Sequence, residues 1–238
     1  MNTVNKLWMR VAVAAIWLGC ASLASAASDW ESTGETGQGR ETVRTWARSV
    51  DGMPVKAFKG VTEVPHTATE VLSLLSDTPN LPNWVFNVRS ASHLAGQPSA
   101  NVYLQFKGIW PAADRDVLVK RQASQLSSGV VLVETREVEG HPEQEGFVRM
   151  RMLRNTFKLT PLPSKWTRIE FETQIDVGGL IPAWIANIVS TKAPRVTLEG
   201  IHKQIKLPKY QGRTASDLPP GFSKDGAVLK LPAEHLAD

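Results

Sequence analysis

Hydrophobic and polar residues alternate along much of the chain, which is typical of β-strands that bury one face. The clearest alternation runs over 166–177, where the apolar side consists of Ile169, Phe171, Thr173, Ile175 and Val177. Alternation predicts further strands over 101–107, 114–121, 130–135, 147–154 and 156–160. So many strands joined by short turns predict an antiparallel sheet with one buried face.

Turn and capping residues organise the part of the chain before these strands. Asp51-Gly52 is a strong hairpin signal between two strands expected over 41–50 and 54–64. A helix is the rival interpretation of 41–50, but its β-branched residues and the turn that follows favour a strand. The capping box Thr67-x-x-Glu70 predicts a short helix over 68–75.

The hydrophobic spacing becomes helical after Gly178-Gly179. An apolar stripe predicts a long C-terminal helix and consists of Trp184, Ile185, Ile188, Val189, Leu198, Ile201 and Ile205. Pro182 suits the first turn of this helix, whereas Pro194 should kink or split it. The segments 27–40 and 211–238 are expected to be a flexible leader and a flexible tail. A single α+β domain over 41–210 lies between them.

The first 26 residues have the organisation of a secretory signal peptide. Lys6 and Arg10 precede the apolar run 11–24, and Ala24-Ser25-Ala26 has the small residues of a cleavage site. We expect cleavage after Ala26 and a periplasmic or secreted protein, without a disulfide because Cys20 is the only cysteine. The alternatives are lipidation at Cys20 and an uncleaved anchor, for which the run is short against a membrane span of roughly 20 residues.

Composition and charge exclude several classes of protein. With 238 residues, 42% of them hydrophobic and 21% charged, the chain can build a core and is neither collagen-like nor disordered. The full sequence has a net charge of +4, which falls to +2 when the signal peptide with Lys6 and Arg10 is removed, and such a small charge does not indicate binding of nucleic acid. The sequence contains no G-x-S-x-G elbow, and its five histidines show no metal-ligand spacing. We therefore expect no catalytic residue, no metal and no cofactor.

Four short motifs occur along the chain: LSD to NWV at 75–85 with Asn87-Val88, WPAADRDV at 110–117, PEQEGFVR at 142–149, and DVGGLIPAWIAN at 176–187. In this order they resemble motifs of START domains, the lipid-transfer domains related to steroidogenic acute regulatory protein. The resemblance implies a helix-grip fold, in which a curved antiparallel sheet wraps around a long C-terminal helix and encloses a hydrophobic cavity. Pro194 and the segment after Tyr210 depart from the family pattern.

The resemblance, combined with the alternation, suggests which residues bind a ligand. The candidates are Trp84, Leu104, Phe106, Trp110, Arg115, Val117, Val119, Arg149, Trp184, Ile188 and Val189. Arg115 lies on the same strand face as Val117 and Val119, so it points to the apolar side. It can bond a lipid head or hydroxyl there, or form a structural salt bridge with Asp114 or Glu134. Arg149 is a second candidate, with a surface position as the alternative.

The function that follows is binding of a single lipid or other hydrophobic molecule, which the protein carries or senses without chemistry. Transient contact with a membrane surface would accompany the transfer, and no nucleic acid is involved. Two alternatives remain open: a periplasmic protein-interaction module with a filled core, and an enzyme like the helix-grip cyclases and hydrolases. The sequence identifies neither the lipid nor the oligomeric state.

Overall fold

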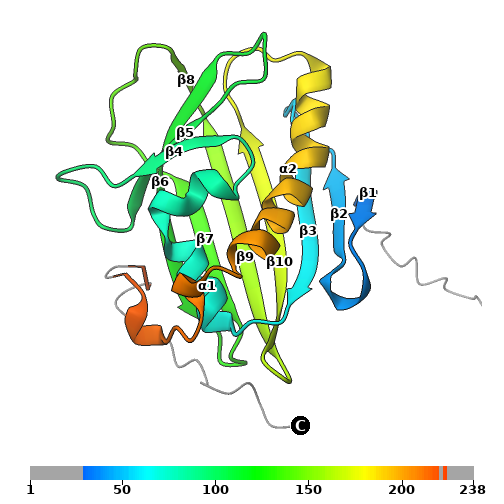
Figure 1. Cartoon of the computed structure of the whole chain (residues 1–238). Helices are drawn as coiled ribbons and strands as arrows, with labels where there is room; N and C mark the ends of the chain where they lie inside the picture. The colour runs from blue at the N-terminus through cyan, green and yellow to red at the C-terminus, as the bar shows by residue number, and fades with distance from the viewer. Residues whose placement is uncertain (1–28, 220–221, 224–238) are drawn as a thin grey trace, which may run out of the picture.

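A single ten-stranded sheet forms the body of the protein, with β9 and β10 near its middle (Figure 1). The computed structural model describes residues 29–219 and 222–223, so the predicted signal peptide lies outside the described residues. The strands are β1 (Glu31–Thr36), β2 (Val43–Arg48), β3 (Ala57–Val64), β4 (Val88–Ser92), β5 (Asn101–Phe106), β6 (Asp114–Gln125), β7 (Val131–Glu137), β8 (Phe147–Arg149), β9 (Met152–Leu162) and β10 (Trp166–Asp176).

The strands follow the order β1-β2-β3-β10-β9-β7-β6-β5-β4, and every pair along this path is antiparallel. The short β8 pairs with the start of β6 in parallel. The pairing of β3 with β10 connects two parts of the sheet that are far apart in sequence. The predicted antiparallel sheet with one buried face is therefore confirmed.

Two α-helices pack on the inner face of this sheet, α1 (Ala68–Ser76) and α2 (Ala183–Gln204). The predicted capping box is present: the Thr67 hydroxyl accepts from the Glu70 amide, and the Glu70 carboxylate accepts from the Thr67 amide. The remaining helical turns are 3₁₀ and comprise η1 (Gly39–Glu41), η2 (Thr78–Asn83), η3 (Pro208–Tyr210) and η4 (Ala215–Asp217).

The long helix α2 runs through Pro194 without a break, so of the two predicted effects of this proline the split does not occur. Figure 1 shows the helix bent near its middle, as expected where a proline removes one hydrogen bond of the helical ladder. No helix within residues 29–219 is long and apolar enough to cross a bilayer.

The prediction of a flexible leader over 27–40 is wrong for residues 31–36, which form β1. This strand is polar and lacks hydrophobic alternation, but its backbone pairs with β2 in an antiparallel ladder. The tail prediction also needs correction, because Phe222 is buried in the core and donates and accepts backbone hydrogen bonds with Pro219 and Ala123. Residues 224–238 lie outside the described part of the chain.

Glycines allow α2 to approach its neighbours closely. A Cβ atom added at Gly200 would lie 2.6 Å from the Trp84 carbonyl oxygen and 2.8 Å from the Trp84 Cα. On the other side of the helix, Leu198 Cδ1 would lie 2.6 Å from a Cβ added at Gly60 of β3. The distance between α2 and its surroundings is therefore set by backbone contact at Gly200, where neither partner can rotate away.

We predict that Gly200→Ala destabilises the protein. In an unhindered helix alanine is more favourable than glycine by about 1 kcal/mol, so helix propensity alone predicts the opposite sign. The clash with the Trp84 backbone should outweigh this gain and lower the free energy of unfolding by about 1–3 kcal/mol. Urea unfolding monitored by circular dichroism measures the change, with the exposed Lys203→Ala on the same helix as the control. An unchanged or raised midpoint would contradict the close approach.

Candidate functional site

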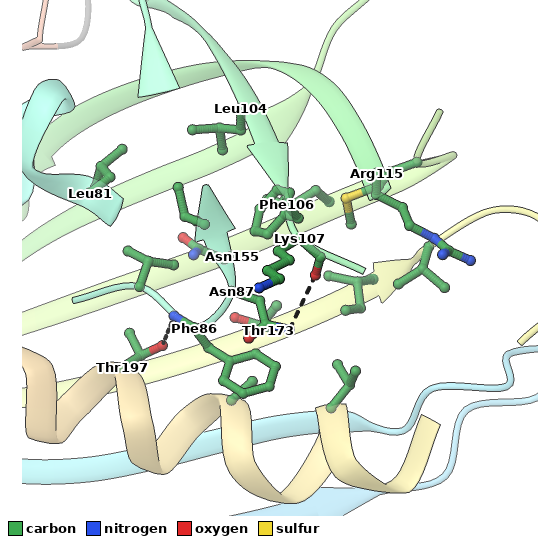
Figure 2. A pocket seen from close by; sticks show the side chains of 18 of the residues that line it. Leu81, Phe86, Asn87, Leu104, Phe106, Lys107, Arg115, Asn155, Thr173 and Thr197 are labelled. Carbon is green, nitrogen blue, oxygen red and sulfur yellow. Dashed lines mark hydrogen bonds between the residues drawn. The ribbon is translucent and has the colours of Figure 1, made fainter. Parts of the chain in front are cut away.

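An apolar cavity of about 150 Å³ lies between the inner face of the sheet and α2 (Figure 2). Its wall combines β5, β9 and β10 with the segment after η2 and with one side of α2. Aromatic and aliphatic side chains dominate it, among them Phe58, Leu81, Phe157, Phe171, Met150 and Ile175. The volume is below the range of roughly 300–1,000 Å³ typical of small-molecule sites, so a lipid-sized ligand would have to push the walls apart.

Five of the residues predicted from sequence lie on this wall: Trp84, Leu104, Phe106, Arg115 and Val189. Leu104 and Phe106 point inward from β5 because alternate residues of a strand share a face. Trp84 lies against Phe157 with its ring edge-on, 6.1 Å between centroids. Whether these side chains contact a ligand stays a prediction.

Three predicted wall residues lie elsewhere. Val117 and Val119 do point to the inner side of β6, as the alternation predicted, but they are fully buried in the hydrophobic core and do not line the cavity. Ile188 is half-buried on α2 and also lies outside the lining, whereas Val189 beside it faces the cavity. The strand period gives the face of a residue, and the curvature of the sheet decides whether packing or open space lies in front of it.

Trp110 and Trp184 are neither wall nor core. Trp110 is 85% exposed in the loop between β5 and β6, and Trp184 is 51% exposed in the first turn of α2. Leu180, just before α2, is 99% exposed. The same two loops contribute Ile109 and Ile181 to the cavity wall. Large hydrophobic side chains therefore face solvent at the end of the cavity that these loops cover.

Arg115 lies at this end of the cavity, and Figure 2 shows its guanidinium pointing away from the other labelled side chains. The side chain is only 7% exposed, and Nη1 donates to the Ala113 carbonyl. Burial lowers the pKa of Arg115, with Asp114 acting in the opposite direction. The expected salt bridge with Asp114 or Glu134 does not form, since Asp114 pairs with Arg89 at 2.6 Å and Arg115 has no ion pair with a described residue.

Arg149 is not a cavity residue. Its guanidinium donates to both carboxylate oxygens of Asp116, at 2.9 and 3.0 Å, and to the carbonyls of His141 and Pro142. Asp116 precedes Val117 on β6, so it points to the outer face, where the Tyr103 hydroxyl also donates to it at 2.7 Å. The network fastens the loop before β8 to the outside of the sheet.

Sequence reasoning did not single out two polar wall residues, Arg121 and Asn155, although signals for one of them were present. Arg121 continues the alternation of Arg115, Val117 and Val119 along β6. Thr173 also lines the cavity, as its place on the apolar side of the alternation over 166–177 implied. Asn155 lies opposite Thr173 on β9, a pairing that no local pattern encodes.

No group of three or more His, Cys, Asp or Glu side chains that could hold a metal ion occurs among residues 29–219 and 222–223. The ionisable side chains that line the cavity in this part of the chain are cations: Lys107, Arg115 and Arg121. An arginine stays protonated at neutral pH and offers five N–H donors, so it suits a polar or anionic group on a bound molecule.

Comparison with known proteins gives a consistent result. Residues 19–196 match the sequence model of the family described as the START domain. An uncharacterized protein of Pseudomonas aeruginosa is 28% identical over 178 residues, which cover 74% of this chain and 86% of the relative.

Solved structures share the fold at lower identity. A STAR-related lipid transfer protein from Xanthomonas axonopodis superposes with a TM-score of 0.64 at 21% identity, covering 75% of this chain and 99% of that one. Human StAR-related lipid transfer protein 5 gives a TM-score of 0.62 at 17% identity, covering 76% and 88%. These two likenesses show that the chain has the helix-grip architecture expected from its sequence.

We predict that Asp116→Asn lowers stability in a pH-dependent way. Burial alone would raise the pKa of Asp116, but hydrogen bonds from Arg149 and Tyr103 hold this pKa below its usual value. The stabilisation is therefore present above the unfolded-state pKa and is lost as the pH falls through the folded-state pKa. At neutral pH the variant should lose about 2–4 kcal/mol, because it leaves Arg149 without its carboxylate.

Denaturant unfolding at several pH values measures this difference, which should shrink towards acid pH. The matched control is Glu134→Gln, the same chemical change at an exposed position of β7. A pH-independent difference, or one equal to that of the control, would contradict the network.

Proposed function

Because the chain belongs to the START domain family, we propose that its cavity binds one lipid or other hydrophobic molecule, which the protein carries or senses in the periplasm without chemistry. The observation that carries the proposal is the apolar cavity between the sheet and α2. Burial of an apolar ligand there would contribute about 25 cal/mol per Å² of surface removed from water, before entropy costs.

The cavity favours this function over the two alternatives. A protein-interaction module with a filled core has no use for an apolar space behind its helix. An enzyme needs a general acid or base whose pKa lies near the operating pH. Two arginines line this cavity, and an arginine stays protonated at neutral pH, so it is a poor general acid or base. The named neighbours of similar fold are lipid transfer proteins, which adds support to the choice.

The proposed location rests on the N-terminal sequence. A basic start, a short apolar run and Ala24-Ser25-Ala26 are the features that a secretion pathway reads, and cleavage after Ala26 would release a mature chain beginning at Ala27. A carrier in that compartment would meet membranes on both sides.

Contact with those membranes is a second part of the proposal. Trp110 and Leu180 project from the two loops that cover one end of the cavity, Trp184 projects from the first turn of α2 next to one of these loops, and Lys107 is exposed in the other. Tryptophan favours the interface between water and lipid, and a lysine is attracted to anionic lipid. Insertion of these side chains would bring the end of the cavity to the lipid surface from which a ligand is drawn.

Native mass spectrometry of the protein purified from its own host tests the binding proposal. We expect a chain that begins at Ala27 and carries one small hydrophobic ligand. Val189→Trp should lower ligand occupancy at least about tenfold, because the larger side chain fills the space between α2 and the sheet. Val196→Trp, at an exposed position of the same helix, is the control and should retain the ligand. A ligand-free protein that also ignores a panel of lipids would exclude the function.

Sedimentation with vesicles tests the membrane contact. Wild-type protein should bind vesicles of phosphatidylcholine and phosphatidylglycerol, and Leu180→Asp should weaken binding roughly tenfold through loss of one buried leucine. Leu126→Asp is the matched control, since Leu126 is exposed in the turn after β6 and lies about 40 Å along that strand from the Trp110 loop. Equal losses in both variants, or none in Leu180→Asp, would contradict the proposed orientation.

A further inference from the structure

A row of polar side chains crosses the otherwise apolar inner face of the sheet. Arg121 on β6 pairs with Thr135 on β7, Thr135 pairs with Asn155 on β9, and Asn155 pairs with Thr173 on β10. Direct partners in antiparallel strands point to the same face, and all four side chains line the cavity. We call these four residues the polar row; Figure 2 shows two of them, Asn155 and Thr173.

Several polar atoms on the cavity wall lack a hydrogen-bond partner. Within the described residues, Asn155 Oδ1, Thr173 Oγ1 and the indole Nε1 of Trp84 are buried and make no hydrogen bond. Arg115 Nε, near the Trp110 loop, is in the same situation. Buried polar groups in folded proteins almost always form a hydrogen bond, because a buried polar group without one destabilises the fold. Such a cluster in one cavity indicates that the bound molecule has polar atoms as well as a hydrocarbon part.

Arg121 indicates which charge the polar group of the bound molecule carries. Its side chain is 6% exposed, and Nη2 donates to the Leu75 carbonyl at 2.5 Å, at the C-terminal end of α1. Burial lowers its pKa to about 10, which leaves it charged at neutral pH. No carboxylate of the described residues pairs with it. The partial negative charge of a helix end compensates a guanidinium only in part, and the fork of N–H donors matches a carboxylate.

The position of Arg121 gives the orientation of the ligand. It follows Arg115 by six positions on β6, which places it roughly 20 Å from the end of the cavity covered by the Trp110 and Leu180 loops. A negatively charged group bound at Arg121 would therefore lie deep, with the apolar part of the molecule extending back towards those loops. The cavity of about 150 Å³ favours one hydrocarbon chain over two.

We propose that the ligand is a single-chain amphiphile with an ionised carboxylate, bound head first, with the carboxylate on Arg121 and further hydrogen bonds donated by the Trp84 indole and the threonine hydroxyls of the polar row. This inference rests on the proposed function, because it names the ligand class of the same cavity. A purely hydrocarbon ligand would leave the buried guanidinium of Arg121 without a counter-ion, which would weaken its binding.

Isothermal titration of the mature chain with dodecanoate and with dodecan-1-ol, which have the same carbon chain, tests the inference. An apolar pocket would bind the alcohol more tightly, because a carboxylate loses more hydration free energy than a hydroxyl when it leaves water. A charged hydrogen-bond partner should reverse this order, so we expect dodecanoate to bind at least about tenfold more tightly. Arg121→Met should restore the preference for the alcohol, and Arg121→Lys should retain part of the preference for dodecanoate.

Arg136→Met is the matched control, since it removes the same charge at an exposed position on the strand beside Arg121 and should leave the order unchanged. Thermal unfolding separates ligand binding from a structural role. A binding arginine should be replaced by methionine with equal or higher stability, whereas loss of stability with an unchanged ligand order would assign Arg121 to α1 alone.

Each other outcome has a definite meaning. If wild-type protein binds the alcohol as tightly as dodecanoate or more tightly, the inference fails and the proposed function stands. A preference for dodecanoate that persists in Arg121→Met overturns the assignment to this residue. Should Arg121→Met not fold, the wild-type order and the Arg121→Lys variant decide. If neither probe binds and lipid panels also fail, the proposed function itself is overturned.

Discussion

The contact between Gly200 of α2 and the backbone of Trp84 is the constraint on which the interior of this protein depends. Two backbones in contact cannot move closer, and at this point the helix is held at a fixed distance from the segment that follows η2. Near Gly60 the helix also lies close to β3, through Leu198. Over the remaining strands α1 and α2 do not fill the concavity of the curved sheet, and the cavity is the space that is left.

The dipeptide Arg115-Asp116 shows how one strand serves two different environments. Consecutive residues of a strand point to opposite faces, so the arginine is directed to the cavity and the aspartate to the outside. Asp116 is matched there by Arg149 and Tyr103, and this network holds the loop before β8. Arg115 keeps a buried nitrogen without a partner. Of these two neighbours, the outward carboxylate is satisfied within the protein, whereas the inward guanidinium is satisfied only in part.

This asymmetry is what a binding protein requires. Polar atoms that the fold leaves unpaired lower its stability, and they persist where another molecule completes them. Arg121, Asn155 and Thr173 lie on the inner face, among apolar neighbours that would pack more favourably against leucine or valine. The same reasoning applies to Trp110 and Leu180, whose exposure to water is unfavourable unless a lipid surface or a partner covers them.

Elements with local signals could be predicted from the sequence alone. Alternation predicted β5, β6, β7 and β10, the capping box predicted α1, and four short motifs indicated the family and its fold. It missed β1, because a polar strand is recognised only by the partner whose backbone it pairs with. Which inward residues meet open space was likewise decided by the tertiary structure. Val117 and Arg121 share a face of β6, but one is packed in the core and the other lines a cavity, since sheet curvature and the position of α1 and α2 are long-range properties. The pairing of Arg149 with Asp116 also follows only from the contact of β8 with β6.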